Sequence, residues 1–157
     1  MKEIAEWALN IAALRGASYA DARIVDERSR ALATKNGKIG SASDAESLGI
    51  GIRVIADGAW GFAASDNLSR EAVESTAAQA VAIAKASASV QQRDVQLAPE
   101  KPATAEWTSP YKTDPFTTSV EQNQELLLKI DSELRSVAGV TLAETNMNFR
   151  RDEQWLL

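Results

Sequence analysis

Histidine and cysteine are both absent from this sequence of 157 residues. Their absence excludes disulfide bonds, thiol nucleophiles, imidazole general bases and the ordinary zinc sites that these side chains build. Carboxylates remain as possible metal ligands, but the sequence has no Asp-x-Asp-x-Asp-Gly loop of the calcium-binding type. Serine is frequent, yet without histidine or a Ser-x-x-Lys motif no activated nucleophile can be assembled in the usual ways. We therefore assign no catalytic, cofactor-binding or metal-binding residue, and we expect the chain alone to lack enzymatic activity.

Positive charge and long apolar runs are also scarce. Lys and Arg number 17 against 22 Asp and Glu, so the formal net charge is −5, a field that opposes nucleic-acid binding. The sequence contains no run of 18 apolar residues, the length that a helix needs to span a bilayer. The acidic Glu3 and Glu6 interrupt the N-terminal apolar stretch, so we do not expect this stretch to be a signal peptide. We expect a cytoplasmic protein that binds neither nucleic acid nor membranes.

Proline occurs in one segment only, between Ser87 and Thr118. Its members are Pro99, Pro102, Pro110 and Pro115. Apolar residues do not recur at regular spacing in this segment, which predicts a long connection between elements. The segment also carries three aromatic residues, Trp107, Tyr111 and Phe116. Their burial contributes about 2 to 3 kcal/mol each, whereas ordering the surrounding residues costs about 1 to 2 kcal/mol apiece. We predict a linker over residues 88–118 that either packs with extra hydrogen bonds or stays partly mobile.

Residues 2–15 are predicted to form a helix, because apolar side chains recur there at helical spacing. The members of this stripe are Ile4, Trp7, Ala8, Ile11 and Leu14. Gly16 is expected to end the helix. From Tyr19 onward, β-branched and small residues alternate with charged ones, which predicts two strands that meet near residues 26–29. Asn36-Gly37 then predicts a hairpin turn, followed by a strand over about residues 38–42.

A second hairpin is predicted around Asp57-Gly58. Its first strand carries two sets of alternating residues on opposite faces: Ile50, Ile52 and Val54 on one, and Gly49, Gly51 and Arg53 on the other. Its second strand places Trp60 and Phe62 on one face, which we expect to pack against a helix as core. That helix covers about residues 70–87, with Ser69 as its cap. Its stripe of small residues implies a close approach to the sheet: Val73, Ala77, Ala80, Val81 and Ala84.

A third helix is predicted to begin after Ser119, with Gln122 as the partner in a capping box. Its expected buried face comprises Leu126, Leu127, Ile130, Leu134 and Val137. Gly139 is expected to end it. Beyond it we predict a strand, a turn near residues 151–153 and the start of another strand. A chain that finishes on Trp155-Leu156-Leu157 in mid-strand exposes apolar surface and an open edge, so we expect a fragment of a longer protein.

These elements predict an α+β fold, in which an antiparallel sheet carries helices on one face and is followed by the linker, a further helix and terminal strands. We divide the chain into an N-terminal sheet domain (1–87), the linker (88–118) and a C-terminal part (119–157). The last part either belongs to the same domain or leads into an absent catalytic domain.

The glycines between Gly49 and Gly61 invite comparison with phosphate-binding loops. Such a loop stands between a strand and the N-terminus of a helix, because the phosphate binds the free amides of that helix. Here Gly49 and Gly51 lie within a predicted strand, and no Gly-Lys-Ser or Gly-Lys-Thr follows. We instead expect these two glycines to leave one sheet face bare, so that a helix or another backbone can come close.

Several motifs in a fixed order carry a family resemblance. They are "GASYADARIV", "ATKNGKI" and "SLGIGIRVIADGAWGFAASDNLS", followed by an Ala-rich helix. Over about residues 16–86 the chain resembles the N-terminal domain of the TldD/PmbA family, proteins described first as modulators of DNA gyrase and later as metallopeptidases. Trp60-Gly61-Phe62 is more similar to the TldD-like than to the PmbA-like branch.

The resemblance implies a cytoplasmic zinc peptidase that acts on flexible peptides or unfolded proteins, as a homo-oligomer or with a family partner subunit. The family carries zinc on a His-Glu-x-x-x-His helix beyond this domain, so zinc is expected in the missing C-terminal part and none in this chain. This domain would then shape the cleft and the subunit contact. Two alternatives stay open: a stand-alone module that binds an extended peptide at a sheet edge, and a nucleic-acid modulator, which the net charge disfavours.

Overall fold

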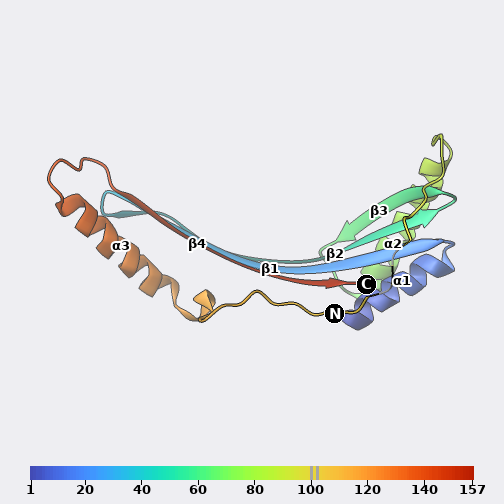
Figure 1. Ribbon diagram of the computed structural model, residues 1–157, viewed down its shortest axis with the longest axis horizontal. Helices are drawn as coiled ribbons and strands as arrows, with labels where there is room; N and C mark the ends of the chain where they lie inside the picture. Colours follow the sequence, from blue (N-terminus) through green and yellow to red (C-terminus); the bar gives the residue numbers. More distant parts are fainter. Residues whose placement is uncertain (100, 102) are drawn as a thin grey trace. The chain divides into compact units, whose positions relative to one another are not determined.

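The computed structural model describes residues 1–99, 101 and 103–157. Its elements are, in chain order, α1 (Lys2–Leu14), β1 (Tyr19–Lys35), β2 (Lys38–Ala56), β3 (Ala59–Ser65), α2 (Arg70–Ala88), the 3₁₀ helix η1 (Pro115–Thr117), α3 (Val120–Ser136) and β4 (Glu144–Leu156) (Figure 1). The strands form one antiparallel sheet in the order β3-β2-β1-β4, with three α-helices packed against it. The expected α+β class is confirmed.

The chain folds into two compact units. Unit 1 comprises Met1–Glu27, Ser47–Pro102 and Asp152–Leu157, and unit 2 comprises Arg28–Glu46 and Ala103–Arg151. Strands β1, β2 and β4 each contribute residues to both units. The boundaries at residues 87 and 118 stay a prediction.

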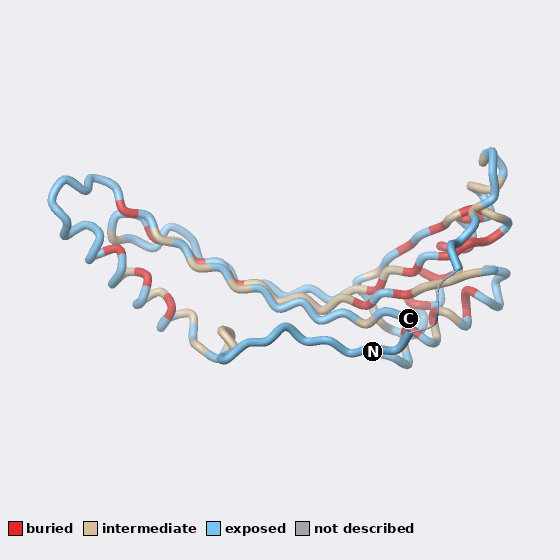
Figure 2. The backbone as a smooth tube through the Cα atoms, viewed as in Figure 1, coloured by how far each residue is buried: buried red, intermediate tan, exposed pale blue. Residues whose placement is uncertain are grey.

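The apolar core of unit 1 lies between its part of the sheet and helices α1 and α2. Its strand members include Ile24, Ile50, Ile52 and Val54, all at most 1% exposed (Figure 2). The predicted small-residue stripe of α2 is buried as a whole, and the close approach of this helix is confirmed at Gly61. A Cβ atom on Gly61 would lie 2.1 Å from the Ala80 carbonyl oxygen.

Both predicted hairpin turns are confirmed. Asn36 and Gly37 have φ angles of 48° and 78°, and Asp57 and Gly58 have φ angles of 51° and 80°. Positive φ at both central residues is the requirement of the type I′ turn, which suits the twist of the flanking strands.

Each of the three long strands is continuous where the sequence predicted an interruption. Strand β1 runs through residues 26–29, β2 runs on past residue 42, and β4 shows no turn at residues 151–153. A charged residue at the predicted interruption of β1 has partners within the sheet: Arg28 pairs with Asp44 at 3.2 Å and with Glu46 at 3.3 Å. Cross-strand ion pairs of this kind let charged residues remain in an extended strand.

Unit 2 is held largely by polar contacts. Arg30 is 5% exposed; its Nη2 donates to Asp44 Oδ2 at 2.7 Å and its Nη1 donates to the Thr118 carbonyl oxygen at 2.7 Å. The Phe116 ring of η1 lies edge-on to Phe149, with ring centroids 6.2 Å apart, and the guanidinium groups of Arg28 and Arg30 lie 4.9 and 5.5 Å from its centroid.

Helix α3 presents a different face to the sheet from the one predicted. The capping box of Ser119 and Gln122 is confirmed. Of the five apolar residues expected to be buried, only Leu127 is, and the other buried positions are the polar Asn123 and Asp131. The reason lies on β1, where the Thr34 hydroxyl is buried and donates to Asp131 Oδ2 at 3.2 Å. A buried polar group needs such a partner, and it sets the rotation of the helix.

Within the described part of the predicted linker, only one of the three aromatic residues packs. Phe116 does so, whereas Trp107 and Tyr111 are 81% and 69% exposed. The segment after α2 is tied to the second hairpin by the Val95 amide, which donates to the Gly58 carbonyl oxygen at 2.8 Å. Pro102 lies outside the described residues.

Candidate functional site

Gly49 and Gly51 of strand β2 lie on the sheet face of unit 1 opposite to the apolar core, where they border an open hollow of ≈ 610 Å³. Part of its lining has little or no side chain, namely Gly49, Gly51 and Ala64. Larger side chains of the lining include Arg23, Val25 and Phe62. The paired register places Gly51 opposite Ala64 and Arg53 opposite Phe62. We call this surface the glycine face.

Of the two expected neighbours, a helix or another backbone, the atoms nearest to Gly49 belong to the backbone of the neighbouring strand and those nearest to Gly51 to a side chain of that strand. A Cβ atom on Gly49 would lie 3.2 Å from the Ser65 carbonyl oxygen of the neighbouring strand, and one on Gly51 would lie 3.0 Å from the Phe62 ring. The helices instead cover the face of Ile50, Ile52 and Val54, which offers the larger apolar area. The prediction that these glycines belong to a strand is confirmed.

Trp60 and Phe62 also lie on this outer face, so the expectation that they form core is wrong. Phe62 is 57% exposed. Trp60 packs edge-on to Tyr19 with ring centroids 5.9 Å apart, and the Arg53 guanidinium lies 4.8 Å from its ring centroid. Sequence reasoning placed the two aromatic residues on one face, but the alternation alone did not reveal that Gly61 and Ala63 are the residues that face α2.

A fixed ion pair stands beside the hollow. Arg53 Nη2 lies 2.8 Å from Asp21 Oδ2, and Arg53 Nε donates to the same oxygen at 2.9 Å. The hydrogen bond from Arg53 to Asp21 raises the pKa of Arg53. Burial, together with the nearby Asp21 carboxylate, raises the pKa of the Tyr19 hydroxyl. Both groups therefore keep their protons at neutral pH, so neither Arg53 nor Tyr19 is available there as a base or a nucleophile.

Arg23 differs from Arg53, because it is exposed and its side chain has no hydrogen bond or ion pair within the described residues. The glycine face thus combines an open guanidinium with an exposed aromatic ring above a nearly bare backbone. An open groove with an exposed cation and an exposed aromatic ring is a surface that can bind a partner.

The side chains of this chain do not fit a zinc site. The sequence provides neither imidazole nor thiolate, and no group of three carboxylates in the described part of the chain could hold a metal ion. Asp44 already accepts hydrogen bonds from the guanidinium groups of Arg28 and Arg30. Separately, no helix among the described residues is long and apolar enough to cross a membrane.

Sequence reasoning missed the polar residues that organise unit 2. Arg30, Thr34 and Asp131 are all buried, although charged residues in an acidic chain ordinarily lie on the surface. Asp131 accepts a hydrogen bond from Arg135 Nε at 2.6 Å. The spacing of four residues between Asp131 and Arg135 was a usable signal, because it aligns opposite charges along a helix.

Comparison with known proteins agrees with the fold and with the motifs. Residues 20–84 match the family described as PmbA/TldA metallopeptidase domain 1. A metalloprotease of Methanocaldococcus jannaschii is 28% identical over 110 residues, which span 70% of this chain and 24% of that protein. The family match over residues 20–84 contains the second hairpin, including Gly49 and Gly51.

Solved structures with the same fold cover nearly the whole chain. A proposed modulator of DNA gyrase from Bacteroides thetaiotaomicron has a TM-score of 0.79 at 15% identity, over 99% of this chain and 36% of that one. TldE from Thermococcus kodakarensis has a TM-score of 0.70 at 16% identity, over 98% of this chain and 34% of that one. The chain thus spans between a quarter and about a third of these relatives. Residues 20–84 thus match domain 1 of the PmbA/TldA metallopeptidase family, and the chain shares the fold of these solved structures.

Proposed function

We propose that this chain is the non-catalytic first domain of a zinc metallopeptidase that cleaves flexible peptides, and that it scaffolds the cleft and the subunit contact. The observation that carries the proposal is the family match over residues 20–84, in a chain with neither histidine nor cysteine. Metal chemistry then belongs to a further part of the polypeptide, where the family's His-Glu-x-x-x-His helix supplies zinc ligands.

The test compares two proteins. One is the product of the longest reading frame that includes these 157 codons, and the other is the 157-residue chain alone. We expect the longer product to cleave an unstructured fluorogenic peptide in the presence of zinc and to lose this activity with a chelator. The shorter chain should leave the peptide intact. Cleavage by the shorter chain, purified free of other peptidases, would overturn the proposal.

A zinc titration of the 157-residue chain by calorimetry gives an independent check. We expect no stoichiometric tight site, because tight zinc sites in proteins use imidazole or thiolate ligands. Cobalt substitution offers a spectroscopic control for weak carboxylate binding. A single tight site in this chain would show that our inventory of ligands is wrong.

The alternative is a stand-alone module that binds an extended peptide at a sheet edge. The strand order supports this alternative, because β3 and β4 are the outer strands of the sheet and β4 is 13 residues long. Outer strands offer backbone groups to an added strand. A stop codon directly after Leu157, together with peptide binding by the chain alone, would favour this module over the peptidase domain.

A further inference from the structure

The glycine face carries one open cation and one open anion. Arg23 of β1 and Asp66, which directly follows β3, both line the hollow and are both exposed. Among the described residues, neither side chain has a hydrogen bond or an ion pair. Opposite charges that stay unpaired on one surface are free to bind a ligand that carries both signs.

The other two charged residues of the lining neutralise each other. Arg53 Nη2 lies 2.8 Å from Asp21 Oδ2, and Arg53 also stacks on the Trp60 ring, whose centroid is 4.8 Å away. These contacts hold the Arg53 guanidinium in place. A ligand in the hollow therefore meets Arg23 and Asp66 as the two charges that still lack a partner.

The sheet sets the spacing of these two charges. Strand β2 lies between β1 and β3, and neighbouring strands are about 4.8 Å apart, so the backbones that carry Arg23 and Asp66 are separated by about 10 Å. Asp66 stands beside Gly49, because a Cβ atom on Gly49 would lie 3.9 Å from the Asp66 Cα. An extended chain spans about 3.3 to 3.6 Å per residue, so three residues cover about 10 Å. The spacing thus suits the two charged termini of a tripeptide.

The floor between the charges suits the body of such a peptide. Gly49 and Gly51 leave the backbone of β2 without side chains, and a Cβ atom on Gly51 would come within 3.0 Å of the Phe62 ring. That ring is 57% exposed and offers an apolar surface to a ligand side chain. The hollow of ≈ 610 Å³ lies within the range of about 300 to 1,000 Å³ that is typical of small-ligand sites.

We propose that the glycine face is a binding site for short peptides with free termini, about three residues long. The peptide carboxylate binds the Arg23 guanidinium, whose planar fork matches a carboxylate, and the peptide ammonium group binds the Asp66 carboxylate. The choice of a peptide among zwitterions rests on the proposed function, because cleavage of flexible peptides releases fragments of this kind. The site binds these fragments and does not cleave them.

NMR titration of the ¹⁵N-labelled 157-residue chain with Ala-Leu-Ala, in the absence of zinc, tests the proposal. We expect saturable shifts of the Gly49 and Gly51 amides, with a dissociation constant below about 1 mM. The C-terminally amidated and the N-terminally acetylated tripeptides should each bind at least about fivefold more weakly, because each has lost one terminal charge. Equal binding of all three peptides overturns the proposal, as does the absence of shifts up to about 10 mM free tripeptide.

Two variants assign each terminus to its partner. Arg23→Gln should weaken binding of the free tripeptide by at least about fivefold and leave binding of the amidated one within about twofold, because both changes remove the same charge pair. Asp66→Asn should behave in the same way toward the free and the acetylated tripeptide. If either variant weakens its free and its capped peptide equally, the assignment of the termini is wrong and the proposal fails.

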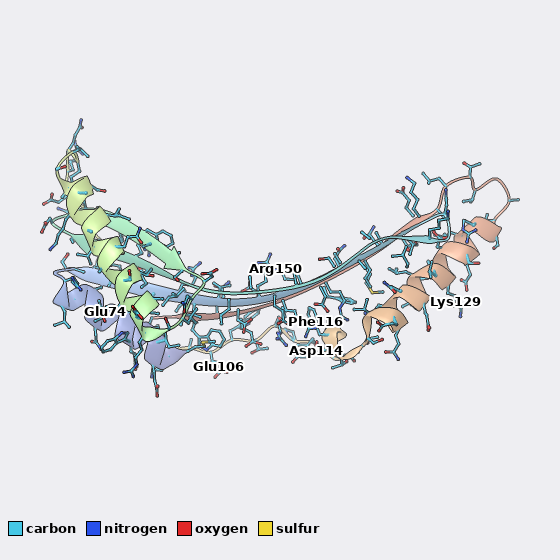
Figure 3. All side chains as sticks on the ribbon, turned by 180° about the vertical axis from the view of Figure 1, so that it is seen from behind. Glu74, Glu106, Asp114, Phe116, Lys129 and Arg150 are labelled. Atoms are coloured by element: carbon cyan, nitrogen blue, oxygen red, sulfur yellow. The ribbon has the colours of Figure 1, made fainter. Side chains whose placement is uncertain are left out.

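Matched controls remove a charge elsewhere in unit 1. Arg93 is exposed and has no side-chain partner in the described part of the chain, like Arg23, but it does not line the hollow. Glu74 lies on α2, the helix that packs on the opposite face of the sheet (Figure 3). Arg93→Gln and Glu74→Gln should both bind the free tripeptide within about twofold of the original chain, and a loss in either would overturn the proposed location. The titration measures binding alone, so its result is separate from the cleavage assay of the longer polypeptide.

Discussion

Gly61 is the residue at which the packing of unit 1 is tightest. A Cβ atom there would lie 2.1 Å from the Ala80 carbonyl oxygen and 2.5 Å from the Ala84 amide nitrogen, both on the backbone of α2. Backbone atoms of a packed helix cannot give way as a flexible side chain can. Gly61→Ala should therefore lower the free energy of unfolding by about 3 kcal/mol, as overpacked cores do.

Urea denaturation followed by far-UV circular dichroism measures this loss. Gly40→Ala is the matched control, because Gly40 also lies in a strand and its added Cβ would meet only an ordinary contact at 3.6 Å. We expect that control to change stability by less than about 0.5 kcal/mol. Equal midpoints for the two variants would mean that α2 can move away from β3 at little cost.

Asp131 gives unit 2 an acid-sensitive contact. The hydrogen bond from Arg135, with further ones from the Gly37 backbone and Thr34, lowers the pKa of Asp131 below its usual value of 3.8 despite burial. A carboxyl group whose pKa is lower in the folded state stabilises the fold above its unfolded pKa. That contribution is lost as the pH falls through the lowered value. We expect stability to decline as the pH falls below about 4.

Urea titrations at a series of pH values below 6 test this sign. Asp44, whose pKa the hydrogen bonds from Arg28 and Arg30 also lower, contributes to the same decline. Asp131→Asn should reduce stability at neutral pH and make the decline in acid shallower. Asp66→Asn, a surface carboxylate of unit 1, serves as control. An unchanged acid slope in Asp131→Asn would show that this carboxylate is not protonated as unit 2 unfolds.

At the scale of elements, the start of α3 depends on its capping box. The Ser119 hydroxyl accepts a hydrogen bond from the Gln122 amide at 3.2 Å, and the Gln122 side chain accepts one from the Ser119 amide at 3.1 Å. Ser119→Ala should cost about 1 kcal/mol of stability. Ser132→Ala, at an exposed position within the helix, should be neutral or slightly stabilising. Equal effects of both variants would mean that α3 does not depend on its cap.

The elements show which parts of the fold a sequence can predict. The two hairpin turns and the buried stripe of α2 followed from local signals, because positive φ angles and helical spacing depend on neighbouring residues. The rotation of α3 did not follow, because it depends on Thr34, which lies 97 positions away from Asp131. The sequence placed Gly49 and Gly51 on the correct strand. It did not show which face of the sheet the helices cover, because that depends on the contact between Gly61 and α2.

The three continuous strands were missed for a related reason. The cross-strand partners of Arg28, Asp44 and Glu46, lie 16 and 18 positions away, so local sequence does not show that the strand continues through Arg28. For the candidate site, the absence of histidine and cysteine directed the search away from catalysis in this chain. The open guanidinium of Arg23 gave no sequence signal, because single basic residues are ordinarily part of a solvated surface.

Across the whole molecule, the two units differ in what holds them together. Unit 1 buries Ile24, Ile50, Ile52 and Val54 against two helices. In the described part of unit 2, the large apolar residues that are buried are Leu32 and Leu127, and the remainder of its interior is mainly polar. Apolar burial supplies most of the driving force for folding, so unit 2 should open more readily than unit 1.

Strand β1 allows this difference to be measured within one element, since Ile24 belongs to unit 1 and Leu32 to unit 2. In native-state hydrogen exchange by NMR, the amide of Ile24 should exchange at least about tenfold more slowly than that of Leu32, and the ratio should grow in Asp131→Asn. Leu127→Ala should widen it further by enlarging the void beneath α3. If the two amides exchange at one rate that tracks global unfolding, the polar contacts of Arg30 and Asp131 stabilise unit 2 as fully as the apolar core stabilises unit 1.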